Sequence, residues 1–116
     1  MGMEDCIFCK IASGEIPAAR VYEDDICLAF NDLSPQAPTH LLIIPRFHFD
    51  SLDEAKNEHM EMLGHLLLTA ANIARHKGFA DNGYRLVINT NADGGQTVFH
   101  LHVHLLAGRP FVFPPG

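Results

Sequence analysis

The 116-residue sequence predicts an α+β fold with a five-stranded, mainly antiparallel sheet, one long helix and a short N-terminal helix. Three strand-like segments precede a single long stretch of helical periodicity, two more follow it, and no repeat or linker interrupts this order. Strands grouped in this way favour an antiparallel sheet with its helix on one face. The length suits one modest core, so we expect a single domain over residues 1–116.

Local signals define the first half of the chain. The segment "DCIFCKIASGEIP" predicts a short helix that Gly14 ends and that Pro17 keeps from resuming. Two strands are predicted by "ARVYED" and "ICLAFND", with "DD" as the turn between them. The loop "SPQAPTH" should be rigid, because Pro35 and Pro38 fix φ. The apolar run "HLLIIP" then predicts a central strand buried on both faces.

The second half begins with the long helix. From about Asp53 to Lys77 the apolar residues follow a helical period, and Gly78 suits the position just after its end. The fourth strand is predicted by "GYRLVINTN", a glycine-rich turn by "ADGGQ", and the fifth strand by "FHLHVHLLAG". Three histidines fall on the long helix, where we expect surface or helix-packing roles: His59, His65 and His76.

Composition narrows the class of partner. The formal net charge is −6 and the chain has no block of Lys and Arg, so we expect no nucleic-acid polymer as partner. We expect no membrane partner, because no apolar run is long enough to span a bilayer. The opening "MGMEDCIF" lacks the basic and apolar regions of a signal peptide, and three cysteines cannot form a complete disulfide framework. We therefore expect a cytoplasmic protein with reduced thiols.

Three histidines alternate with apolar residues in "FHLHVHLL": His100, His102 and His104. On a strand they would share one face while the apolar residues pack into the core. Three interpretations are open: a polar strand face, a catalytic zinc site with three histidines, or nucleophilic and acid–base chemistry on phosphorus. The preceding "DGGQT" favours the third, because glycines can bring backbone amides close to an anion.

The sequence resembles the histidine-triad (HIT) family, whose signature of alternating histidines and apolar residues stands here as "HLHVHLL", residues 100–106. Nearly the whole chain takes part, and "SPQAPTH" and "DGGQ" are similar to the Hint branch of purine nucleoside phosphoramidate hydrolases. The resemblance implies a purine nucleotide substrate and chemistry that requires no metal. It also implies a homodimer with one continuous sheet, in which the C-terminal residues approach the partner's active site. The apolar tail "GRPFVFPPG" fits this, although it lacks a tryptophan often found there.

The resemblance further implies roles for single residues. His102 would be the nucleophile of a nucleotidyl-histidine intermediate, which water hydrolyses to release a nucleoside monophosphate. His104 would contact the phosphate, His40 would support the triad, and Asp32 would accept hydrogen bonds from the ribose hydroxyls. The phosphate and leaving-group side would be held by Asn89, Gly95, Gln96 and the catalytic Thr97. The base would lie among apolar residues: Ile7, Phe8, Ile16, Phe30 and Leu33.

The pair Cys6 and Cys9 in "CIFC" is a second candidate site. A redox role is disfavoured, because a redox-active Cys-x-x-Cys normally follows a strand and opens a helix in a βαβ unit. Here only five residues precede the pair. Zinc with two further ligands is favoured over reduced thiols that pack as small hydrophobes. Other HIT proteins with this motif complete a structural zinc site with the histidine of "IPxxH" and the first triad histidine. By that resemblance the remaining ligands here would be His48 and His100.

Two classes of function follow from these interpretations. The first is an enzyme, an adenosine 5′-monophosphoramidase-like hydrolase that cleaves a P–N bond through His102. The second is a zinc-stabilised nucleotide-binding sensor or scaffold with little catalysis. A dinucleoside polyphosphate hydrolase is a variant of the first class, and "SPQAPTH" with "GGQT" favours the phosphoramidate branch over it.

Overall fold

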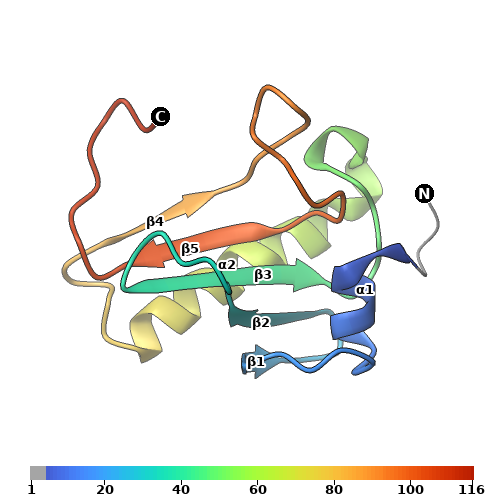
Figure 1. Ribbon diagram of the computed structural model, residues 1–116, viewed down its shortest axis with the longest axis horizontal. Coiled ribbons are helices and arrows are strands. Elements are labelled where there is room, and N and C mark those ends of the chain that lie inside the picture. The colour runs from blue at the N-terminus through green and yellow to red at the C-terminus, as the bar shows by residue number, and fades with distance from the viewer. Residues whose placement is uncertain (1–4) are drawn as a thin grey trace.

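The computed structural model describes residues 5–116, so the first four residues of the predicted domain lie outside the described part. The chain forms one five-stranded sheet with the order β1-β2-β3-β5-β4 (Figure 1). Every neighbouring pair is antiparallel, which confirms the predicted fold class. The strands are β1 (Arg20–Glu23), β2 (Cys27–Asn31), β3 (Thr39–Pro45), β4 (Tyr84–Val87) and β5 (Val103–Ala107).

Two α-helices accompany the sheet. The long helix α2 (Met60–His76) crosses one face, and the short helix α1 (Ile7–Ala12) lies beside the end of β3 (Figure 1). Gly78 follows α2 with φ at +85°, a left-handed conformation that glycine adopts without strain, as predicted for the helix end. Among the described residues, no helix is long and apolar enough to cross a membrane.

The central strands β2 and β3 are buried on both faces, which divides the interior into two clusters. On one face, Ala29 and Ile43 pack with Leu66 of α2. On the other face, Leu28 packs with Phe8 of α1. The prediction that "HLLIIP" is buried on both faces is confirmed. Although α1 has only six residues, its side chains complete the second cluster.

The long helix starts later than predicted. Instead of beginning at Asp53, the chain makes two short 3-10 turns, η2 (Leu52–Glu54) and η3 (Asn57–His59), before α2. Between them Ala55 and Lys56 have extended backbone, with ψ of 146° and 174°. The physical reason is that neither η2 nor η3 contains a buried residue, and helices in proteins are stabilised mainly by packing of an apolar face.

Strand β5 is also shorter than predicted. It begins at Val103, so His100 and His102 lie in the segment just before the strand. In β3 the last residue paired with β5 is Ile43, and the carbonyl of Pro45 instead faces the ring of His100. The side chains still alternate as predicted: Leu101, Val103 and Leu105 all pack into the cluster beneath α2. Strand β4 likewise ends at Val87, before the predicted "INTN".

A partly buried contact joins α2 to the turn between β1 and β2. Asp24 accepts hydrogen bonds from the backbone N–H groups of Ile26 and Cys27 and from the Tyr22 hydroxyl, each at 2.8 Å. His65 of α2 places its Nε2 at 2.7 Å from the same carboxylate. His65 therefore has a defined partner, which its position on the helix did not predict. Burial raises the pKa of Asp24, but these hydrogen bonds outweigh it and hold the pKa well below its usual range.

We expect Asp24→Asn to lower the free energy of unfolding at pH 7 by about 1–3 kcal/mol, because hydrogen bonds to a charged acceptor are lost. A carboxyl group with a depressed folded-state pKa stabilises the protein above its unfolded pKa of about 4 and loses this contribution as pH falls towards the folded value. The difference between the two proteins should therefore shrink below pH about 4. Urea unfolding at pH 7 and pH 3 measures it, with Asp25→Asn as the exposed neighbouring control. A difference that stays constant with pH would contradict this assignment.

Candidate active site

A hollow of about 660 Å³ opens on the face of the sheet that carries α1. It brings together residues from four separate parts of the sequence: the segment 7–19 that includes α1, the segment 30–42, the glycine-rich turn with the residues just after it, and the segment 102–104 at the start of β5. Eleven of the predicted site residues line it: Ile7, Phe8, Ile16, Phe30, Asp32, Leu33, His40, Gly95, Thr97, His102 and His104. Asn89 and Gln96 do not.

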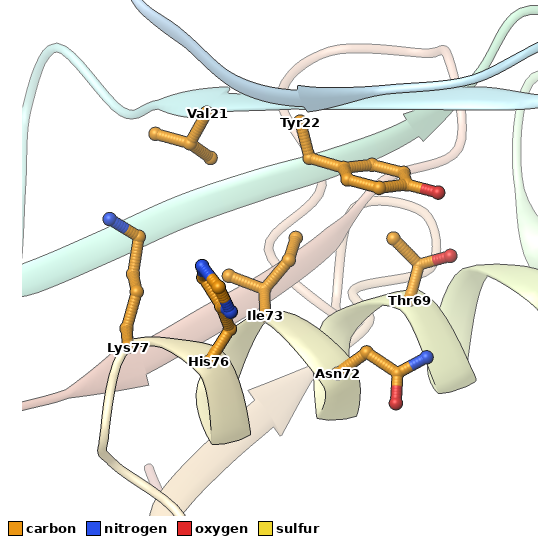
Figure 2. Close-up of a pocket in the computed structure, with 7 residues that line it drawn as sticks. All are labelled: Val21, Tyr22, Thr69, Asn72, Ile73, His76 and Lys77. Carbon is orange, nitrogen blue, oxygen red and sulfur yellow. The ribbon is translucent and has the colours of Figure 1, made fainter.

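A second hollow, of about 460 Å³, lies between β1 and α2 (Figure 2). Val21 and Tyr22 approach it from the strand, and Thr69, Ile73 and His76 approach it from the helix. None of the predicted catalytic or metal-binding residues lines it. We therefore place the candidate active site in the first hollow.

His102 has a defined tautomer. Its Nδ1 lies 2.8 Å from the carbonyl oxygen of His100, which can only accept, so Nδ1 carries the hydrogen when the ring is neutral. The other nitrogen, Nε2, then holds a lone pair. Burial lowers the pKa of His102, which keeps the ring neutral near pH 7. A neutral imidazole with one nitrogen held in this way is equipped to act as a nucleophile through the other.

His40 and His104 form a directed hydrogen-bond pair across β3 and β5. The backbone N–H of Gln36 donates to His40 Nδ1 at 3.0 Å, so the hydrogen of the neutral His40 ring sits on Nε2. That nitrogen lies 2.9 Å from His104 Nδ1, which accepts. His104 is left with a hydrogen on Nε2, and this buried atom has no partner among the described residues. The pair thus offers one unpaired N–H donor beside the hollow.

Burial keeps these rings neutral. It lowers the pKa of His104 to about 4, with further lowering from His102 and His40, and it also lowers the pKa of His40. Asp32 opposes the effect weakly, with its Oδ2 at 3.4 Å from His40 Nε2. His104 therefore acts at neutral pH as an uncharged donor. A buried uncharged donor can meet an anionic oxygen without the cost of burying a lone cation.

The apolar wall of the hollow contacts the histidines directly. Phe8 meets His102 edge to face, with ring centroids 5.1 Å apart, and meets Phe30 in the same manner at 5.6 Å. Leu33 is 98% exposed at the rim. A flat apolar ligand could be enclosed between these groups, whereas Asp32 and the histidines offer polar contacts at the other side.

The turn before the histidines is a constrained loop. A Cβ on Gly94 would lie 2.4 Å from the carbonyl oxygen of Thr90, and Gly95 has φ at +86°, so both positions require glycine. Gln96 is buried and holds the loop together: Oε1 accepts from the N–H of Asn91, and Nε2 donates to the carbonyls of Asp50 and Val98. The side-chain amide of Gln96 therefore hydrogen-bonds to the protein backbone rather than facing the hollow. Gly95 and Thr97, on either side of it, line the hollow.

The four predicted metal ligands lie together. The ligand atoms of Cys6, Cys9, His48 and His100 lie within 4.8 Å of one another. His48 Nδ1 is 3.1 Å from His100 Nδ1 and 3.3 Å from Cys9 Sγ. His100 Nδ1 is 3.3 Å from Cys6 Sγ. These separations are close to the edges of a tetrahedron around zinc, roughly 3.3–3.8 Å for the usual Zn–N and Zn–S bond lengths.

The surroundings of the cluster also suit a cation. His100 Nε2 faces the Pro45 carbonyl at 2.9 Å and His48 Nε2 faces Asp50 Oδ1 at 3.0 Å, so the Nδ1 atoms of both rings face each other and the cysteines. Burial raises the pKa of Cys9 to about 11, so formation of its thiolate needs a nearby positive charge. The donor set of two sulfurs and two imidazoles fits zinc.

Comparison with known proteins identifies the family. The chain matches the HIT domain model over residues 13–111. It belongs to the HIT family. An uncharacterized HIT-like protein of Synechococcus elongatus is 58% identical over 113 residues, which cover 97% of this chain and 98% of that protein. The purine nucleoside phosphoramidase of Escherichia coli is 51% identical over 107 residues, which cover 92% and 90%.

Solved HIT structures agree with the fold. The crystal structure of a HIT family hydrolase from Legionella pneumophila superposes with a TM-score of 0.94 at 51% identity, covering 96% of this chain and 99% of that one. A zinc-bound histidine triad family protein from Mycobacterium smegmatis superposes with a TM-score of 0.78 at 34% identity, covering 93% and 78%. The HIT fold predicted from the sequence is thereby confirmed.

Gln96→Ala should destabilise the protein by about 1–3 kcal/mol, because it removes the hydrogen bonds that the buried Gln96 amide makes to the backbone of Asn91 and Asp50. Urea unfolding measures this change. Thr97→Ala, at the exposed neighbouring position, serves as the control and should leave the free energy of unfolding nearly unchanged. Equal stability of the two variants would show that the Gln96 amide does not hold the loop.

Proposed function

We propose that this protein is a hydrolase that cleaves the P–N bond of purine nucleoside phosphoramidates through a nucleotidyl-histidine intermediate. The observation that carries the proposal is the pair of fixed tautomers: His102 offers the lone pair of Nε2, and His104 offers an unpaired N–H from the neighbouring position. A nucleophile next to an uncharged donor suits attack on an anionic phosphorus centre. The likeness to the Escherichia coli phosphoramidase supports this substrate class.

The proposed reaction has two displacement steps at phosphorus. First, His102 Nε2 forms a bond to phosphorus, the P–N bond breaks, and the leaving amine takes a proton from a water molecule. Second, water attacks the same phosphorus, the bond to Nε2 breaks, and nucleoside monophosphate leaves. In both steps His104 Nε2–H would donate to a phosphoryl oxygen, and the carbonyl of His100 would stabilise positive charge that develops on the His102 ring.

Substrate contacts follow from the walls of the hollow. The base would lie against Phe8, Phe30 and Leu33, together with Ile7 and Ile16, and Asp32 would accept hydrogen bonds from the ribose hydroxyls. Gly95 and Thr97 would hold the phosphate and the leaving-group side. Gln96 would contribute indirectly by shaping their loop, and Asn89 has no lining position to support a direct contact.

We also propose a structural zinc ion, held by Cys6, Cys9, His48 and His100. Its chemistry would be to cross-link α1 to the sheet, and no step at phosphorus involves it. The convergence of the four donor atoms and the zinc-bound Mycobacterium smegmatis relative support this proposal. Reduced thiols are needed for such a site, so we place the protein in the cytoplasm.

A homodimer with one continuous sheet remains part of the proposal for the single domain over residues 1–116. It is supported by apolar surface that the single chain leaves uncovered. On α2, Met60 and Leu68 are more than half exposed, and in the tail Val112 and Phe113 are exposed. Exposed apolar residues of this size commonly mark a protein–protein contact when they lie together.

His102→Ala should lower kcat/KM for an adenosine phosphoramidate by about 10³-fold or more while AMP still binds, since the variant loses the group that forms the covalent bond. Turnover assays and calorimetry of AMP binding measure the two effects. His76→Ala, on α2 and outside this hollow, should keep normal turnover. Full activity of His102→Ala would refute the mechanism. AMP binding by the wild type without turnover of any phosphoramidate would instead support the sensor or scaffold function.

Purified protein should contain about one zinc ion per chain, and Cys6→Ala should contain almost none, because a closed zinc site needs all four ligands. Mass spectrometry for metals measures the content, and thermal unfolding with and without chelator measures the effect on stability. Cys27→Ser, at a buried cysteine outside the cluster, should keep its zinc. Equal zinc contents in the two variants would contradict the ligand assignment.

A further inference from the structure

The segment that follows β5 is clamped onto the loop before β3. Gly108 comes so close to this loop that a Cβ on it would lie 2.8 Å from Cβ of Pro38, and its φ is +98°. The next residue, Arg109, directs Nη2 and Nε at the carbonyl oxygen of Gln36, at 3.0 and 3.4 Å. The guanidinium group is therefore held against the loop although the side chain is exposed.

Further contacts fix Arg109 in this orientation. Its Nη1 donates to the carbonyl of Pro110 at 3.0 Å, and the guanidinium carbon lies 4.3 Å from the centroid of the Phe111 ring. Stacking of Arg on an aromatic ring and two hydrogen bonds to one carbonyl restrict the same planar group. Arg109 thus holds a backbone carbonyl rather than an acidic side chain.

Gln36 connects this clamp to the catalytic histidines. Its carbonyl accepts from Arg109, and its N–H donates to His40 Nδ1 at 3.0 Å. Only the Cα of Gln36 separates these two groups, and the prolines on either side, Pro35 and Pro38, have fixed φ and restrict the neighbouring backbone. The hydrogen bonds from Arg109 that restrain the carbonyl of Gln36 therefore also restrain the orientation of its N–H.

The N–H of Gln36 decides the direction of the hydrogen bond between His40 and His104. With two neutral rings, either His40 Nε2–H donates to His104 Nδ1, or the hydrogen sits on His104 Nδ1 and His40 accepts. The second arrangement places a hydrogen on His40 Nδ1, where it would meet the N–H of Gln36. It would also turn a bare lone pair of His104 Nε2 towards an anionic ligand. Asp32, 3.4 Å from His40 Nε2, favours the first arrangement too.

We propose that Arg109 is a positioning residue of the active site: by holding Gln36, it sets the tautomers of His40 and His104 and so keeps the N–H of His104 directed at the phosphoryl group. The phosphoryl part of this statement rests on the proposed function, whereas the tautomer part does not. Arg109 touches neither the substrate nor the reacting atoms and acts through two intervening residues.

The test compares Arg109→Ala, Arg109→Lys and Arg85→Ala with the wild type. Arg85 is a matched control, because it also lies against the Phe111 ring and donates to a tail carbonyl, that of Val112, but does not contact Gln36. ¹⁵N chemical shifts of the imidazole nitrogens report the tautomers directly. The wild type and Arg85→Ala should show the hydrogen on Nε2 of both His40 and His104.

In Arg109→Ala the shifts of both rings should move towards a mixture with the Nδ1–H form, and in Arg109→Lys, which keeps one donor, they should move less. With an adenosine phosphoramidate, kcat of Arg109→Ala should fall about 10- to 100-fold, the scale on which small misplacements of catalytic groups act, and KM should change less. Arg85→Ala should keep the wild-type kcat.

Three results would overturn the proposal: unchanged tautomers in Arg109→Ala, an equal change in Arg85→Ala, or loss of activity in Arg109→Ala with wild-type tautomers. Thermal unfolding of each variant shows that the chain is folded when the spectra are recorded. If the tautomers respond as expected but the wild type turns over no phosphoramidate, the positioning role stands and the proposed substrate class is wrong.

Discussion

The structure depends above all on His100, whose ring takes part in the proposed zinc site and whose backbone takes part in the proposed catalytic site. Its ring points Nδ1 at the cysteines and His48 and pairs Nε2 with the carbonyl of Pro45, whereas its own carbonyl accepts from His102. The burial of the ring lowers its pKa to about 4, so it is neutral and suited to a ligand role. The three histidines that alternate along the sequence are therefore in three different environments.

Much of this architecture is readable from the sequence. The order of strands and helices follows from periodicity, and the burial of β3 on both faces follows from "HLLIIP". The convergence of His48 and His100 on Cys6 and Cys9 could be expected only from the resemblance to other HIT proteins, because both histidines are far from the cysteines in the chain. The hollow likewise contains nearly all of the expected residues, since α1, the end of β2 with the loop after it, the glycine-rich turn and the start of β5 all lie around it.

The features that sequence reasoning missed are set by backbone groups or by long-range pairing. Nothing in the identity of Gln36 indicates that its N–H orients His40, because every residue except proline has that group. Gln96 carries a side chain that suits phosphate binding, yet a buried amide must satisfy its own hydrogen bonds, and here the loop provides them. His65 contacts Asp24 because α2 packs across the sheet next to the turn between β1 and β2. No local sequence pattern predicts a contact between residues 41 positions apart. The segment 53–59 has charges typical of a helix start, but the 3-10 turns η2 and η3 that it forms contain no buried residue.

The contacts that define both sites join distant parts of the chain. Cys6 and His100 are 94 residues apart, and His40 and His104 are 64 apart. Contacts of such long sequence separation carry the closure entropy of a long loop, which slows the folding of chains that depend on them. Both sites also share β5 and the residues just before it, so neither can exist until this strand has paired with β3. The geometry of the two proposed sites should therefore form together, and a partial opening of β5 would remove both at once.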